Sequence, residues 1–231
     1  MALDPRKRQR KLEKRRAKQK AERREVARLQ SQGLAGQFQQ AAAAPVLHCL
    51  AATDLWEQGI GNVLISRRLK DGAVAFVVFL VDMYCLGVKD VIMNVAPRAR
   101  YDRDLYGKLA DQATLVPLKP ECARKLVEGA VEYARDLGLP PYPDYRTAKL
   151  IFGDVVAEAC SEQYVYGKNG KPFFVAGPYD GPLKCRQILR TLENHVGPDG
   201  YHFLMPVGGP HFDIGMLPDE EEPSDENLLP P

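Results

Sequence analysis

The sequence predicts an α+β protein whose sheet is mostly antiparallel and built from hairpins, with helices packed against it. Two apolar, β-branched stretches flank Asp71-Gly72, a dipeptide typical of tight hairpin turns. Residues 121–137 carry apolar side chains at helical spacing. The expected strands and helices come in clusters, without the strict alternation of a doubly wound sheet and without an internal repeat.

Residues 1–31 form a basic arm that precedes this domain. Residues 1–30 hold 13 Lys or Arg against 4 Asp or Glu. Most of them are strong helix formers, and Pro5 suits a first helical turn. The few apolar side chains form no continuous stripe, so such a helix has nothing to bury against a core. We expect a helix that projects into solvent or forms when the arm is bound.

Residues 32–45 are predicted to be a flexible linker, because they contain Gly33, Gly36, several glutamines and four alanines before Pro45. The folded domain is then expected over 46–210, and residues 1–45 should be dispensable for folding.

The domain is followed by an acidic, Pro-rich tail over residues 211–231. Residues 218–231 hold six acids and no base, whereas residues 31–217 hold 19 bases and 20 acids. The two ends of the chain, and not the domain surface, therefore dominate its electrostatics.

The first hairpin has its strands at 62–69 and 73–81. A two-residue turn that pairs Lys70 with Ala73 would place odd-numbered residues of the first strand on the same face as even-numbered residues of the second. The second strand is apolar on both faces, so it should be central and covered on both sides. A further strand is expected at about 88–95.

The helix over 121–137 is the best defined one, because Gly138 stands where a C-cap would and Pro140-Pro141 follows. A second hairpin is predicted around Asn169-Gly170, joining 163–166 to 172–176.

The last helix opens at Asp180-Gly181-Pro182, where Pro182 suits the first helical position. A final strand is expected near residues 201–207.

The cysteines favour a reducing, cytoplasmic setting, because they are odd in number, form no CxxC pair and follow no secretory signal. A domain of this size can bury a stable core without disulfide bonds. The longest apolar run, residues 73–81, is far shorter than the roughly 20 residues that cross a bilayer, so no membrane association is expected. The five cysteines are Cys49, Cys85, Cys122, Cys160 and Cys185.

The prediction of nucleic-acid binding rests on the basic arm. Closely spaced cations release condensed counterions from a phosphate backbone and so bind nucleic acid with little sequence reading. RNA, including the ribosome, is favoured over sequence-specific DNA, because no zinc-finger spacing or helix-turn-helix follows the arm. The alternative is a solvated tail that keeps the protein soluble. The cations expected to contact phosphates are Arg6, Lys7, Arg8, Arg10, Lys11, Lys14, Arg15, Arg16, Lys18, Lys20, Arg23 and Arg24.

Three groups of motifs stand out within the domain. They are Phe79-Leu80-Val81-Asp82 with Cys85-Leu86-Gly87-Val88-Lys89-Asp90, Tyr133-Ala134 with Leu137-Gly138, and Gly167-Lys168-Asn169-Gly170-Lys171-Pro172 with Gly177-Pro178-Tyr179-Asp180. Together they resemble an uncharacterised family of bacterial proteins, a domain of unknown function. The resemblance covers residues 47–207 and excludes both tails. It implies a single domain in a bacterial cytoplasm, and it brings no activity, cofactor or partner with it.

Three aspartates could supply oxygen ligands for a catalytic Mg²⁺ if they converged: Asp82, Asp90 and Asp180. The favoured interpretation is that Asp82 and Asp90 cap turns and that Asp180 caps a helix N-terminus.

Other candidate sites are weaker. Cys85 with His202 could form a thiol nucleophile, but a buried cysteine is favoured. His48-Cys49 has no zinc partner at ligand spacing, and residues 167–171 lack the pattern of a phosphate-binding loop. No metal or cofactor is predicted.

The preferred interpretation is a non-enzymatic module, an α+β domain tethered to an RNA- or DNA-binding arm. One alternative is a metal-dependent hydrolase that acts on nucleic acid recruited by the arm. Another is a protein-interaction adaptor whose acidic tail contacts a basic partner or shields the arm.

Overall fold

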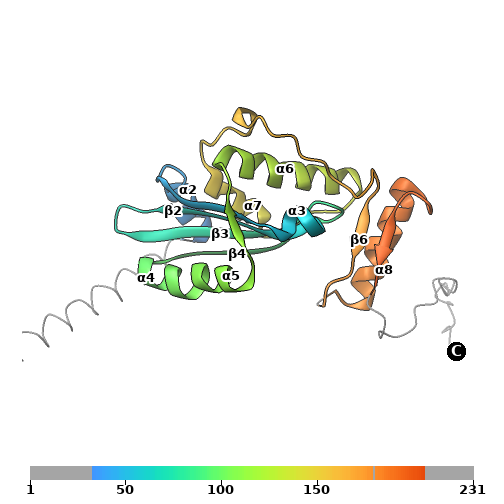
Figure 1. Ribbon diagram of the computed structural model, residues 1–231, viewed down its shortest axis with the longest axis horizontal. Coiled ribbons are helices and arrows are strands. Elements are labelled where there is room, and N and C mark those ends of the chain that lie inside the picture. The colour runs from blue at the N-terminus through green and yellow to red at the C-terminus, as the bar shows by residue number, and fades with distance from the viewer. Residues whose placement is uncertain (1–32, 179, 206–231) are drawn as a thin grey trace, which may run out of the picture.

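A five-stranded antiparallel sheet lies at the centre of the protein, so the fold is α+β as predicted (Figure 1). The computed structural model describes residues 33–178 and 180–205, and the predicted arm and acidic tail lie outside them. The strand order is β4-β3-β2-β1-β5. The strands are β1 (Val46–Ala52), β2 (Ile60–Arg68), β3 (Ala73–Asp82), β4 (Gly87–Pro97) and β5 (Leu115–Pro117).

The β2–β3 hairpin forms as expected, but its register is one residue away from the predicted one. Leu69, and not Lys70, bonds to Ala73, with the Leu69 amide donating to the Ala73 carbonyl at 2.8 Å. The turn therefore has three residues, and Gly72 closes it with a φ of +82°. A shift of one residue changes which side chains share a face, so Ile65 lies opposite Val77. Strand β3 is buried on both faces, as predicted.

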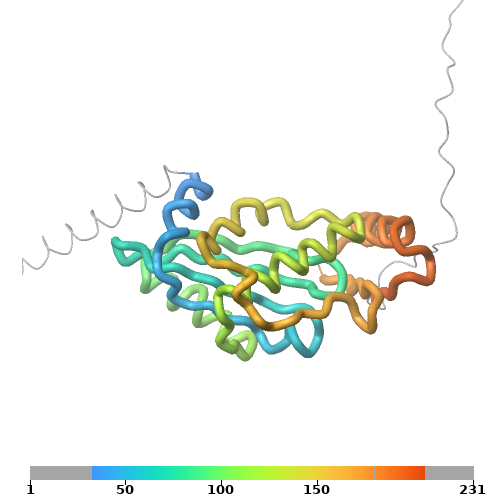
Figure 2. The backbone as a smooth tube through the Cα atoms, turned by 90° about the horizontal axis from the view of Figure 1, so that it is seen from above, coloured from blue at the N-terminus to red at the C-terminus, as the bar shows by residue number. Residues whose placement is uncertain are grey.

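One face of the sheet is covered by α6 (Pro120–Asp136), the helix that the sequence predicts best. Its apolar side packs on the odd-numbered residues of β2 and β3, together with α2 (Leu34–Ala41), α7 (Tyr145–Ala148) and the 3-10 helix η2 (Lys149–Phe152). Figure 2 shows these segments along the same side of the sheet.

The prediction of a flexible linker over 32–45 is wrong for most of that segment. Residues 34–41 form α2, and Phe38 and Ala41 are completely buried in the main core. The glycines and glutamines suggested flexibility, but one aromatic side chain with a tertiary partner outweighs that local preference. The domain therefore begins at α2, and the expectation that residues 1–45 are dispensable conflicts with this packing.

The opposite face of the sheet is covered by α4 (Arg98–Tyr101), the π-helix η1 (Asp102–Tyr106) and α5 (Gly107–Gln112). Tyr101 and Leu109 pack there against the even-numbered residues of β3. These helices were not predicted from the sequence. With them the protein has three layers, helices on both sides of a sheet.

A smaller apolar cluster lies at one end, where α8 (Pro182–Val196) packs against the C-terminal part of α6 (Figures 1 and 2). Pro182 opens α8 as predicted. The turn at Asn169-Gly170 also forms, with positive φ at both residues. The predicted second hairpin is reduced to a single antiparallel bridge between Lys168 and Lys171, because residues 163–166 form no strand. Strand β6 (Phe173–Val175) pairs instead in parallel with β7 (His202–Leu204).

The remaining short elements are α3 (Asp54–Gln58) and the 3-10 helix η3 (Ala157–Ala159). Among the helices within 33–178 and 180–205, none combines the length and the apolar character that crossing a bilayer requires.

Candidate functional site

The twelve cations predicted to contact nucleic acid all precede residue 33, so they lie outside the described residues. The structure does show where the arm joins the domain, because α2 begins directly at Leu34 after its N-cap Gly33. Since α2 is packed into the core, the arm is attached to a fixed helix and not to a flexible linker.

The segments α2, the β2–β3 turn and α4 lie together at one end of the sheet (Figure 1), and the end of β2, the turn, α4 and η1 carry five exposed cations. Two contacts tie these segments to one another. The Arg68 amide donates to the Pro45 carbonyl at 3.0 Å, and Ala73 pairs with Pro97, the residue before α4. We call this region the arm-proximal end. Its exposed cations are Arg68, Lys70, Arg98, Arg100 and Arg103.

The arginines of α4 and η1 are partly neutralised by carboxylates of the same helical segment. Arg98 pairs with Asp102 at 2.7 Å, and Arg100 and Arg103 both pair with Asp104. No ion pair is recorded for Arg68 or Lys70 within the described part of the chain. Because Asp71 lies in the same turn and Arg100 and Arg103 share Asp104, the five exposed cations of the arm-proximal end stand against three aspartates, which leaves a net charge of +2.

A buried hydrogen-bond network holds the helical layer onto the sheet beside this end. The Tyr101 hydroxyl lies 2.7 Å from His48 Nδ1 and 3.1 Å from Ser66 Oγ, and the His48 ring stacks on Tyr106. A β-bulge in β1 precedes His48. Burial, followed by the nearby Arg98, lowers the pKa of His48, so the ring is uncharged near neutral pH.

Bulges and π-helices are both frequent next to active sites, which makes this network a candidate for chemistry. However, Ser66 and Tyr101 are both buried, so a substrate could not reach their hydroxyls. The network therefore positions α4 and η1, and with them the arginines that those helices carry.

Arg67 is a buried cation that ties β2 to two other segments. It donates to the carbonyls of Ala44, Ile151 and Phe152 at 2.5 to 2.6 Å. It also lines an open hollow of about 610 Å³. Because acidic Glu121 and Asp154 border the same hollow, it is poorly suited to an anion.

The three aspartates considered as Mg²⁺ ligands are each engaged elsewhere. Asp82 accepts hydrogen bonds from the backbone amides of Tyr84 and Cys85, so it caps a turn as predicted. Burial raises its pKa to about 6. Asp90 lies within β4 and accepts from the Val91 amide at 2.8 Å, so its predicted turn-capping role is wrong.

Asp180 does not cap the last helix through its side chain, because no capping bond is made at the N-terminus of α8. Its carboxylate instead accepts from the Gly177 amide and pairs with Lys89 at 2.6 Å and with Lys184 at 2.9 Å. Although burial alone would raise it, the two lysines lower the pKa of Asp180 to about 2. Across 33–178 and 180–205, no group of three or more His, Cys, Asp or Glu side chains is arranged to hold a metal ion.

The two lysines that hold Asp180 border a groove of about 500 Å³, which we call the proline groove. One wall is the loop 139–143 and the other is the exposed side of α8. The groove is mostly apolar, and Lys89 and Lys184 outnumber Asp180 at its rim. This groove was not predicted from the sequence. Pro140-Pro141 was a local signal of the loop, but the opposing helix comes from a distant segment.

The thiol candidates are not assembled into sites. Cys85 is fully buried in the smaller cluster, and burial raises the pKa of its thiol. His202 is exposed on β7. Cys49 is also buried, which raises the pKa of its thiol to about 12. Neither cysteine has the thiolate character that a nucleophile requires.

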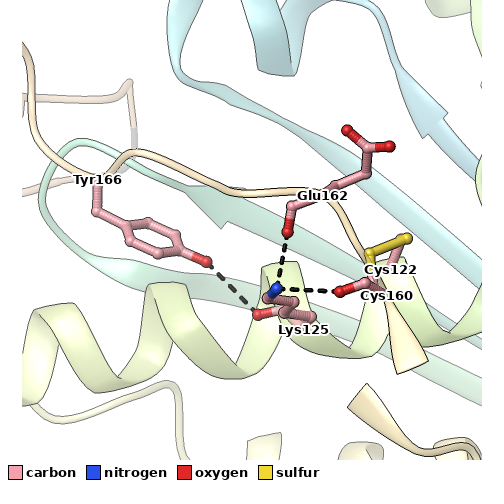
Figure 3. The surroundings of a disulfide bond; sticks show 5 residues. All are labelled: Cys122, Lys125, Cys160, Glu162 and Tyr166. Atoms are coloured by element: carbon pink, nitrogen blue, oxygen red, sulfur yellow. Dashed lines mark hydrogen bonds between the residues drawn. A yellow bond between two sulfur atoms is a disulfide. The ribbon is translucent and has the colours of Figure 1, made fainter. Parts of the chain in front are cut away.

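Two of the five cysteines form a disulfide between Cys122 and Cys160, which departs from the expectation of a reducing setting (Figure 3). The bond joins the start of α6 to the residue after η3. Lys125 supports it by donating to the carbonyls of Cys160 and Glu162 at 3.1 and 2.7 Å. The Tyr166 hydroxyl donates to the Lys125 carbonyl. The disulfide and these hydrogen bonds together join α6 to residues 160–166.

No family model, curated protein or solved structure matches this chain.

Proposed function

We propose that the protein is a non-enzymatic nucleic-acid-binding protein of the bacterial cytoplasm, in which a helical basic arm supplies most of the affinity. The observation that carries this proposal is the charge layout, with 13 Lys or Arg against 4 Asp or Glu in residues 1–30. Such an array gains affinity from counterion release, and this favours RNA or the ribosome, where no base-specific contact is required.

The folded domain adds support at the place where the arm begins. Because α2 is packed into the core, phosphates bound by the arm would lie close to the arm-proximal end. Arg68 and Lys70 are exposed there and free of ion pairs among the described residues. The domain would thus extend the path of the phosphate backbone beyond the arm.

Fluorescence anisotropy with labelled single-stranded RNA and duplex DNA, measured across a salt series, tests the proposal. If about six arm cations contact phosphates, log affinity should fall with log salt at a slope of about −5 for duplex and about −4 for single strands. Replacing Arg6, Lys7, Arg8, Arg10, Lys11, Arg15 and Arg16 by glutamine keeps the helix propensity and should abolish binding. Equal binding by that variant, or binding insensitive to salt, would refute the proposal.

The contribution of the domain is measured separately with the double variant Arg68→Gln/Lys70→Gln. It should weaken binding and make the salt slope shallower by about 1 to 2, since each lost phosphate contact contributes about 0.9. The matched control is Arg135→Gln/Arg190→Gln, which removes the same charge from exposed sites on α6 and α8. That control should leave the slope unchanged if the arm-proximal end, and not net charge, matters.

A further inference from the structure

The proline groove combines an apolar floor with a basic rim. Leu86, Leu139 and Ile188 line it and belong to the smaller apolar cluster. Pro140, Pro141 and Pro143 add further apolar surface on the opposite wall. The groove therefore offers an apolar surface that the described residues leave uncovered.

The charges at the rim favour an acidic occupant. Lys89 is held by Asp180 and its side chain is only 12% exposed, whereas the side chain of Lys184 is 54% exposed. With one carboxylate between two lysines, the rim keeps a net positive charge that an incoming carboxylate would neutralise.

The chain itself contains a segment with the matching pattern. Residues 211–217 carry four apolar side chains, and Asp219 to Glu222 follow as four consecutive acids. The apolar side chains are Phe212, Ile214, Met216 and Leu217.

The segment is also within reach of the groove. Met205, the last described residue, packs against the same apolar cluster that provides the groove floor. The seven residues from Met205 to Phe212 span at most about 25 Å when extended. The 15 residues of α8 measure about 22 Å along the helix axis. The Leu204 carbonyl accepts from the Ala176 amide at 3.0 Å, beside Gly177, whose amide donates to the Asp180 carboxylate that holds Lys89 and Lys184. The last described residues therefore lie near the rim, and a span of this length brings Phe212 within reach of the groove.

We propose that the proline groove binds the chain's own C-terminal segment, residues 211–222, with the apolar side chains in the groove and the acids at the Lys184 rim. Binding in the same chain raises the effective concentration of the segment, so weak individual contacts suffice. The proposal does not depend on nucleic-acid binding by the arm.

Zero-length carbodiimide cross-linking of the full chain tests the proposal, because this reagent joins a lysine to a carboxylate that touches it. Lys184 should link to the acids between Asp219 and Glu222, whereas the exposed Lys108 on α5 should not. An equal mixture of ¹⁴N- and ¹⁵N-labelled protein shows whether the links are intramolecular, since links between copies would give mixed pairs.

The triple variant Ile214→Ser/Met216→Ser/Leu217→Ser removes apolar anchors and keeps every acid. It should lower the yield of the Lys184 links at least about tenfold, since each buried apolar side chain contributes about 1.5 to 3 kcal/mol, and 1.4 kcal/mol is a factor of ten. The matched control Leu228→Ser/Leu229→Ser lies beyond the proposed segment and should leave the yield unchanged.

Several results would overturn the proposal. Equal linking to Lys108 would mean that the tail contacts cations without preference. Links to lysines of the arm would mean that the tail shields the arm instead. Mixed isotopic pairs would mean that the groove binds a second copy, and the absence of Lys184 links would mean that the segment is not there at all.

Discussion

Arg67 shows how a single residue can join distant parts of the chain. Its guanidinium is buried, and burial lowers its pKa despite the nearby Asp154. The three carbonyls that it satisfies belong to the α2–β1 connection and to η2. A buried cation is tolerated only when its donors are used in this way.

We expect Arg67→Met to lower the free energy of unfolding by about 3 kcal/mol, because three buried carbonyls would lose their charged donor. Urea denaturation measures the change. The neighbouring Arg68→Met is the control, since that side chain is exposed and unpaired among the described residues, and it should change stability by less than about 0.5 kcal/mol. Similar effects of both substitutions would contradict this role of Arg67.

Asp82 links the stability of the protein to pH. Its pKa of about 6 lies above its ordinary value of 3.8, so the folded protein keeps a proton that the unfolded chain has lost in this window. The free energy of unfolding should therefore fall as the pH rises from 4 to 6. Two pKa units correspond to about 3 kcal/mol.

The Asp82→Asn variant cannot lose this proton. Relative to the variant, the wild-type protein should lose about 3 kcal/mol of stability between pH 4 and pH 7, as measured by urea denaturation at both values. A constant difference between the two proteins would mean that Asp82 is ionised throughout the window. Direct titration of the Asp82 carboxyl carbon by NMR gives an independent value.

At the scale of elements, local patterns predicted the hairpin and the main helix, because Asp71-Gly72 and the spacing over 121–137 act within a few residues. The predicted register was wrong because the turn length is not set by local sequence alone. Lys70 belongs to the turn, and Leu69 is the last paired residue before it. Which residue ends the pairing depends on which side chains face the core. The dipeptide alone does not distinguish a two-residue turn from a three-residue one.

The three-residue turn needs a left-handed residue at Gly72, where φ is +82°. We expect Gly72→Ala to lower the free energy of unfolding by about 1 to 2 kcal/mol, although no atom lies near the added methyl group. Gly36 in α2 also has open space but helical geometry. Gly36→Ala should instead raise stability by about 0.5 to 1 kcal/mol, and a loss at both positions would contradict this explanation.

Helix α2 was missed because its stability comes from tertiary packing, which a stretch rich in glycine and glutamine does not reveal. The buried Phe38 now gives a different expectation for truncation. Removing residues 1–32 should leave the urea midpoint nearly unchanged, whereas removing residues 1–42 should lower stability by about 3 kcal/mol or more, the usual cost of losing a buried Phe. Equal midpoints for the two truncations would show that α2 contributes little.

For the whole molecule, the sequence predicted the uneven charge but not where the charge would act. The arm-proximal end contains Pro45, Arg68 and Arg98, which lie at one end of the sheet because β1 begins there and β2 and β4 end there. The proline groove likewise depends on α8 packing beside the loop 139–143. Contacts between segments this far apart have no local pattern, so they follow from the fold and not from a motif.

The Cys122–Cys160 disulfide acts on the whole molecule because it closes a loop across a sequence separation of 38, one that contains α6, α7 and η2. A loop of that length restricts the unfolded chain enough to stabilise the folded protein by about 4 kcal/mol. We expect a reductant such as TCEP to lower the urea midpoint accordingly. The Cys122→Ala/Cys160→Ala variant should start at that lower midpoint and not respond to TCEP.

Thiol titration under denaturing conditions should find two more thiols after reduction, since Cys49, Cys85 and Cys185 are free. A wild-type protein purified from a reducing cytoplasm with five titratable thiols, and with the stability of the double variant, would show that the bond does not form there.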